Sequence, residues 1–128
     1  MARVALAALI AAPLMSGCVY VSAHEASTPA VVSIDTSGMP GEMEPIHAAA
    51  FTADSALFQV SSNGCTDRDD IEPVVSRVDE EVVITLRRLT PDNCRAWLAD
   101  GVQLEFSLEE LGLETGERAR INNPFLIR

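Results

Sequence analysis

The sequence contains no lysine, one tryptophan, one tyrosine and only two histidines. All nine basic residues are arginine, and nineteen acidic residues outnumber them, so the net charge is −10. Nucleic-acid binding depends on clustered basic side chains, with aromatic side chains among them where single strands are bound. The composition therefore argues against nucleic acid as a partner.

Histidine is too scarce to support most hydrolytic sites. His24 and His47 both lie in a segment that we predict to be a tether, so a Ser-His-Asp triad would need a histidine from outside the predicted strands. Acidic pairs are plentiful, but they lie in patterns typical of exposed surface, and few aromatic residues are present to support a sugar ring. We expect Trp97 to pack near Cys94, in the core or at its edge, rather than to bind a sugar. The sequence predicts no enzyme and no cofactor.

No apolar run reaches the roughly 20 residues of a membrane-spanning helix. The longest run, 4–15, follows the positive charge of Arg3, contains Pro13 and is followed by the small residues Ser16 and Gly17. A positive, then apolar, then small order is that of an export signal. We therefore predict that residues 1–17 are a signal peptide.

The residues Met15-Ser16-Gly17-Cys18 resemble the lipobox of bacterial lipoproteins, with methionine where leucine is usual. The resemblance implies cleavage after Gly17, diacylglycerol on the Cys18 sulfur and a further acyl chain, such as palmitate, on its amino group. Two or more acyl chains hold a protein stably on a membrane. In lipoproteins of Gram-negative type, Val19 in place of aspartate points to the outer membrane, facing the periplasm.

A second cleavage site gives an alternative. Val21-Ser22-Ala23 meets the small-x-small requirement of ordinary signal peptidase, and cleavage after Ala23 would discard Cys18. The product would be a soluble periplasmic or secreted protein without a lipid anchor.

Cysteine is also scarce, and with Cys18 assigned to lipid only Cys65 and Cys94 remain. An even pair in an exported protein predicts a disulfide. Closing a loop of about 30 residues would stabilise the fold by about 3–4 kcal/mol. Neither cysteine belongs to a CxxC motif, which argues against thiol exchange and zinc binding.

Beyond residue 50 the apolar residues alternate with polar ones, which is the pattern of β-strands. In the strongest candidate Val102, Leu104, Phe106 and Leu108 share one face. Further strands are predicted at 56–60, 74–78, 82–89, 95–98 and 118–121. Turn residues at 90–93 and 99–101 separate them. This spacing predicts an all-β fold, a small antiparallel sandwich or barrel in which an Ig-like arrangement is one option.

One short helical turn is predicted near 107–111. Ser107 and Glu110 have the spacing of a capping box, and Gly112 suits the end of such a turn. The domain division that we predict is a signal peptide at 1–17, the lipidated cysteine and a flexible tether at 18–50, and a disulfide-closed β domain at 51–128. Within the tether, 31–34 is a candidate strand.

Between Phe58 and Phe125 the segments NGCTDRDD, PDNCRAW, LEFSLEELGL and INNPF occur in that order. This order resembles a group of small proteobacterial envelope proteins with two cysteines and a terminal Asn-Pro-Phe. No reaction is assigned to that group, so the resemblance implies no catalytic residue. We interpret the segments as structural: a disulfide, a helical turn and a proline that ends the last strand.

The acidic loop formed by Asp67, Asp69 and Asp70 offers the oxygen ligands that calcium prefers. The glycine and the distal glutamate of an EF-hand loop are missing, however, and Arg68 places a positive charge within the cluster. A solvated loop beside the disulfide is the interpretation that we adopt.

Met39, Met43 and His47 recur every four residues, and their thioether and imidazole groups suit copper. They would share one face only of a helix, and the prolines at 40 and 45 argue against a helix there. The sequence thus favours an exported, lipid-anchored protein that binds an unidentified envelope protein or ligand. The alternative is a periplasmic module for copper or calcium.

Overall fold

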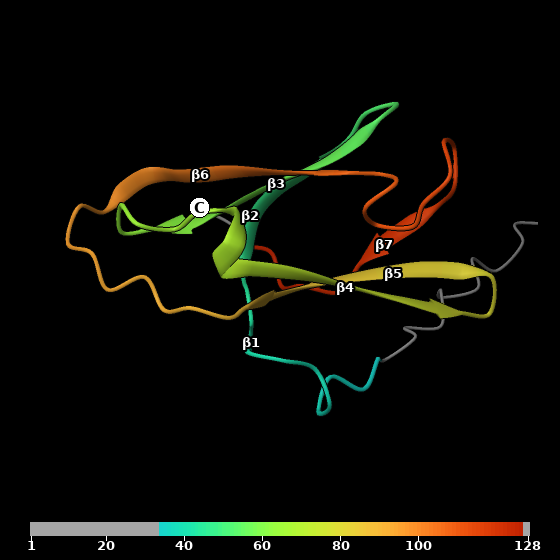
Figure 1. Ribbon diagram of the computed structural model, residues 1–128, viewed down its shortest axis with the longest axis horizontal. Helices are drawn as coiled ribbons and strands as arrows, with labels where there is room; N and C mark the ends of the chain where they lie inside the picture. Colours follow the sequence, from blue (N-terminus) through green and yellow to red (C-terminus); the bar gives the residue numbers. More distant parts are fainter. Residues whose placement is uncertain (1–33, 127–128) are drawn as a thin grey trace, which may run out of the picture. The chain divides into compact units, whose positions relative to one another are not determined.

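The computed structural model describes residues 34–126, which form two layers of β-strands (Figure 1). The strands are β1 (Glu42–Met43), β2 (Ile46–Phe51), β3 (Ser55–Ser62), β4 (Ile71–Val78), β5 (Glu81–Arg88), β6 (Leu98–Ser107) and β7 (Ala119–Ile121), with a 3₁₀ turn η1 at Arg68–Asp70. The predicted all-β class is confirmed: two packed sheets form a sandwich and no closed barrel. Within 34–126, no helix has the length and apolar character needed to cross a membrane.

One sheet has the order β1-β5-β4, with β7 running parallel to β5 along part of its edge, and the other has the antiparallel order β2-β3-β6. Alternating side chains from both sheets fill the space between them. Leu104 and Phe106 are buried while Gln103 and Glu105 are exposed, as the alternation predicted. Phe106 packs edge-on against Phe58, with ring centroids 6.0 Å apart. This core follows from the period-two pattern.

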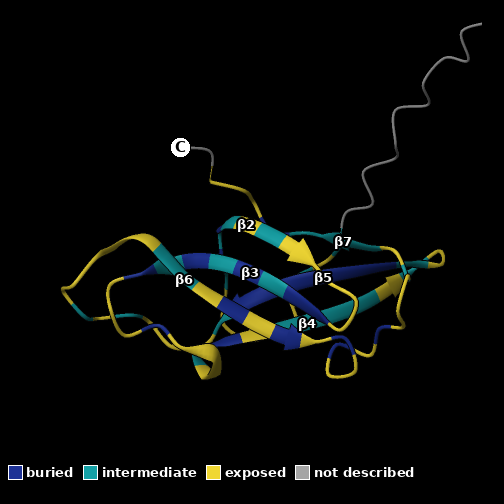
Figure 2. Ribbon diagram, turned by 90° about the horizontal axis from the view of Figure 1, so that it is seen from above, coloured by how far each residue is buried: buried dark blue, intermediate teal, exposed yellow. Residues whose placement is uncertain are grey.

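Strand β5 is buried on both faces, as its colour in Figure 2 shows. The face away from the core carries polar side chains that other segments cover. Arg87 donates from Nε to the Pro40 carbonyl at 2.8 Å and from Nη2 to the Gly41 carbonyl, and Asn122 Nδ2 lies 3.3 Å from Thr85 Oγ1. The residues before β1 and after β7 therefore form part of the folded domain.

The domain begins earlier than the predicted boundary at residue 51. Strands β1 and β2 fall within 18–50, so the prediction of a tether is wrong for 42–50. Ile46 is fully buried, pairs with Val60 and donates its N–H to the Pro124 carbonyl at 3.0 Å. Partners distant in the sequence order this Ala-rich stretch, and local composition does not reveal them. The predicted signal peptide, Cys18 and positions 31–33 of the candidate strand lie outside the described residues, and Ile34 is not in a strand.

Two local predictions around β6 are wrong. Of the predicted strand at 95–98 only Leu98 lies in a strand, and 99–101 is a bulge within β6 rather than a turn between strands. Gly101 has φ +67°, and a Cβ at this position would lie 2.0 Å from the Val60 carbonyl oxygen. The glycine therefore marks a close backbone approach.

The turn predicted near 107–111 forms as a single hydrogen-bonded turn. Ser107 Oγ accepts the Glu110 N–H at 3.1 Å, and the Leu111 N–H donates to the Ser107 carbonyl at 3.1 Å. Gly112 has φ +64°, and the following Leu113 N–H donates to the Leu108 carbonyl at 2.8 Å. This is the glycine-terminated ending expected from the sequence.

The segment after β7 joins the two sheets. β7 pairs with β5 of one sheet, whereas the Pro124 carbonyl and the Leu126 N–H both bond to Ile46 of β2 in the other, at 3.0 and 2.8 Å. The INNPF segment therefore has a structural role in this fold.

Candidate functional site

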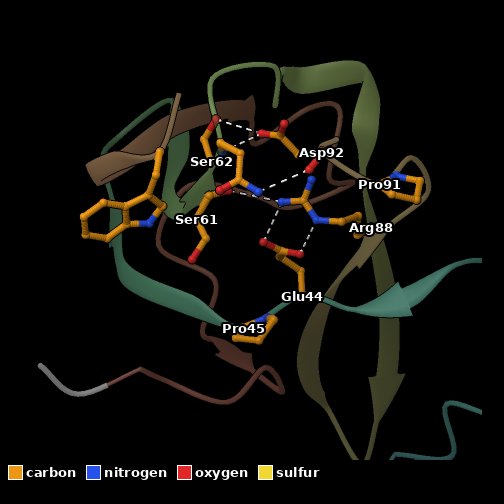
Figure 3. Close-up of a pocket in the computed structure, with 9 residues that line it drawn as sticks. Glu44, Pro45, Ser61, Ser62, Arg88, Pro91 and Asp92 are labelled. Atoms are coloured by element: carbon orange, nitrogen blue, oxygen red, sulfur yellow. Dashed lines mark hydrogen bonds and ion pairs between the residues drawn. The ribbon is translucent and has the colours of Figure 1, made fainter. Parts of the chain in front are cut away.

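A pocket of about 390 Å³ opens where β3 and β5 end (Figure 3). Its walls come from the β1–β2 connection, the end of β3 and the loop between β5 and β6. The lining residues are Glu44, Pro45, Ser61, Ser62, Asn63, Arg88, Pro91, Asp92 and Trp97. The volume lies within the range of small-ligand sites.

A buried ion pair forms one wall of the pocket. Arg88 donates from Nε and Nη2 to the two carboxylate oxygens of Glu44, at 2.6 and 2.8 Å, and the two side chains are 16% and 5% exposed. Its other N–H groups donate to the Ser61 carbonyl at 3.2 Å, to Thr66 Oγ1 at 3.1 Å and to the Thr90 carbonyl at 3.5 Å. The hydrogen bonds to Glu44 raise the pKa of Arg88 above its ordinary value. All five guanidinium N–H groups are thus used within the protein.

Asp92 holds the neighbouring loops together. Its carboxylate accepts from the Thr66 hydroxyl at 2.7 Å, the Asn63 N–H at 2.7 Å, the Ser62 hydroxyl at 3.1 Å, the Cys94 N–H at 3.1 Å and the Cys65 N–H at 3.3 Å. Desolvation alone would raise the pKa of Asp92. The hydrogen bonds, first among them that from Thr66, outweigh it and hold the pKa well below its usual range. Figure 3 shows Asp92 turned toward Ser62, in the same pocket as Arg88 and Glu44.

The predicted Cys65–Cys94 disulfide is present in the structure, with Cα atoms 5.7 Å apart. It joins the loop after β3 to the loop after β5, and Asp92 accepts the backbone N–H of both half-cystines. The two sulfur atoms and an Asp92 carboxylate oxygen lie within 4.8 Å of one another. Because the sulfurs are bonded to each other, this group offers no thiolate ligand to a metal.

Trp97 lies at the pocket and is 67% exposed. We predicted that Trp97 packs near Cys94 in the core or at its edge, and the placement in the core is wrong. The loop that carries it is fixed by the disulfide at Cys94 and by the Ala96 N–H, which donates to the Asn63 carbonyl at 2.8 Å. These bonds order the chain around Trp97 without burial of the indole ring.

His47 contacts a pocket residue that the sequence did not connect with it. It is the extra residue of a β-bulge between Ile46 and Ala48, and its Nε2 lies 2.8 Å from Ser61 Oγ. A His-Ser contact of this length occurs in hydrolases, where a carboxylate at Nδ1 orients the ring. Here Nδ1 is buried and has no hydrogen-bond partner among residues 34–126. The described residues thus provide the first two members of a triad arrangement without the third.

Two carboxylates of the acidic loop accept hydrogen bonds from backbone N–H groups of the same loop. Asp67 Oδ1 accepts the Asp69 N–H at 2.9 Å, and Asp70 Oδ2 accepts the Asp67 N–H at 2.9 Å, which together form a capping box on η1. The Arg68 guanidinium lies 4.5 Å from the Phe106 ring centroid. The three carboxylates do not form a metal-ligating cluster in the part of the chain that the structure describes.

The three residues considered for copper do not share a helix face. Met39 lies in the turn before β1, Met43 lies in β1, and His47 lies in β2 of the other sheet. The Met43 sulfur is 3.6 Å from Asn123 Nδ2, and His47 contacts Ser61. The side chains of Met43 and His47 thus have separate partners.

No protein-family model matches the chain, and no curated protein or solved structure is significantly similar to it.

Proposed function

We propose that this chain is an exported envelope protein, anchored by lipid on Cys18, whose β domain is a non-enzymatic binding module on the periplasmic side of the outer membrane. The observation that carries the proposal is the pairing of Cys65 with Cys94. Disulfides persist in oxidising compartments and are rare in the cytosol. The bond is consistent with the export signal that we predict at 1–17, and it leaves Cys18 as the one cysteine available for lipid.

The pocket beside the disulfide supports a binding role. Its charged side chains are held by internal hydrogen bonds, so the site is formed before any ligand arrives. Exposed aromatic side chains are frequent anchors at binding sites, and Trp97 supplies one here. A preorganised pocket beside an exposed indole ring is suited to recognition.

Intact-mass spectrometry of the protein recovered from bacterial membranes tests the anchor. We expect a chain that begins at Cys18 and carries diacylglycerol and one further acyl chain. A chain that begins at His24 without lipid would contradict the proposal and would identify a soluble exported protein.

The Cys18→Ser variant is the matched control for the anchor. It removes the lipid acceptor and leaves Cys65 and Cys94 intact. We expect that this variant does not give the mature, membrane-bound chain. Retention of a processed chain on the membrane without lipid would count against anchoring at Cys18.

A further inference from the structure

The pocket offers hydrogen-bond acceptors more readily than charged donors. Among the described residues that line it, Arg88 is the only one with a cationic side chain, and all five N–H groups of Arg88 already bond to protein oxygens. An anionic ligand could contact Arg88 only by replacing one of these buried bonds. The Asn63 amide donates from Nδ2 to the Asp92 carbonyl at 3.2 Å, so its oxygen can accept from a ligand. The site is thus poorly built for a phosphate or a carboxylate.

The charge of the pocket also favours a cation. Two carboxylates, those of Glu44 and Asp92, line it against the single guanidinium of Arg88. The whole chain carries a net charge of −10, which attracts cationic partners over long range. Trp97 adds an exposed indole ring, the aromatic group that attracts cations most strongly.

We propose that this pocket binds a cationic side chain, arginine or lysine, presented by a partner protein. The cation lies against the Trp97 ring, where the Asn63 amide oxygen accepts from it and the negative charge of Asp92 attracts it. This inference names the partner chemistry of the binding module proposed above and rests on that function.

Trp97 is the only tryptophan in the chain, so tryptophan fluorescence, excited selectively over that of the single tyrosine, reports on the pocket. The mature protein, purified in neutral detergent, is titrated with N-acetyl-arginine amide. N-acetyl-citrulline amide is the matched probe, because it has nearly the same shape without the charge. We expect a saturable change with the arginine probe, weakened by added salt, and little response to the citrulline probe.

Calorimetry on three variants locates the binding. Trp97→Leu should weaken binding of the arginine probe by about 2- to 30-fold, the range of a cation–π contact, and Trp97→Phe should weaken it less. Phe51→Leu is the control, because Phe51 is a 44% exposed aromatic residue that does not line this pocket. Its affinity should be unchanged. Trp97→Phe keeps the test informative should Trp97→Leu fold poorly.

Any one of the following results would overturn the inference. They are equal binding of the arginine and citrulline probes, unchanged affinity in both Trp97 variants, and preferential binding of an N-acetylglucosamine trimer, which would indicate a glycan site. Absence of any fluorescence response at millimolar arginine probe would do the same. Because the assay reports binding whether or not Cys18 carries lipid, failure of the pocket and failure of the anchor are separate results.

Discussion

The side-chain amide of Asn123 pairs with the backbone of Leu86 as a neighbouring strand would. Asn123 Oδ1 accepts the Leu86 N–H at 2.8 Å, and Nδ2 donates to the Leu86 carbonyl at 2.8 Å and to the Glu44 carbonyl at 2.7 Å. β7 pairs with β5 as far as Ile84, and β1 pairs with it from Arg87. Asn123 fills the gap between these two partners.

Removal of this amide should destabilise the fold. Asn123→Ala leaves the buried Leu86 N–H without its partner, and we expect a loss of about 2–4 kcal/mol in the free energy of unfolding, measured by urea denaturation. Asn122→Ala is the control, because Asn122 is half-buried and its side chain makes one 3.3 Å contact with Thr85. It should cost about 1 kcal/mol or less. Equal losses in the two variants would refute this role of Asn123.

The sequence predicted the parts of the fold that depend on local pattern. The alternation in β3 and β6 identified the core faces, and Ser107 and Gly112 identified the turn that follows β6. Cysteine parity predicted the disulfide. These features could be predicted because period, capping and pairing each leave a signal within one short segment or within one residue type.

Features that depend on distant contacts could not be predicted. Asp79 and Glu80 turn the β4–β5 hairpin with φ of 49° and 70°, although neither is the glycine that usually marks such a turn. His47 meets Ser61 only because a bulge places it there, and Trp97 is exposed because its loop is tied at Cys94. The candidate pocket combines three segments that are separate in the chain, so no single motif encodes it.

The disulfide should contribute a large share of the domain's stability. We expect the double variant Cys65→Ala/Cys94→Ala to lose about 3 kcal/mol of unfolding free energy, because the unfolded chain gains the freedom of an open loop of about 30 residues. Urea denaturation of this variant and of Cys18→Ser distinguishes the effect of losing the disulfide from the effect of losing Cys18. Thiol labelling of unfolded, unreduced Cys18→Ser should detect no free thiol, and labelling at both positions would contradict the bond.

Two glycines with positive φ should respond differently to alanine. A Cβ at Gly116, where φ is +84°, meets nothing within 4 Å, so Gly116→Ala costs only the left-handed backbone strain of about 1–2 kcal/mol. A Cβ at Gly101 would lie 2.0 Å from the Val60 carbonyl oxygen and must displace the β3–β6 pairing. We expect Gly101→Ala to cost about 1–3 kcal/mol more. Similar thermal unfolding midpoints in the two variants would contradict the close approach at the bulge.

Asp92 should make stability depend on pH in the acid range. Its folded pKa lies below the unfolded value of about 3.9, so its contribution is fully present above that pH and is lost as the pH falls toward the folded pKa. Asp92→Asn cannot be protonated in this way and should be less stable than wild type at pH 7. The difference in unfolding free energy should narrow below about pH 4, where the unfolded carboxyl binds a proton. Urea denaturation at a series of pH values measures this difference. The control is Asp69→Asn, at an exposed side chain, which should change the free energy of unfolding little at neutral or acid pH. If the difference between Asp92→Asn and wild type stayed constant with pH, the Asp92 carboxylate would not hold these loops.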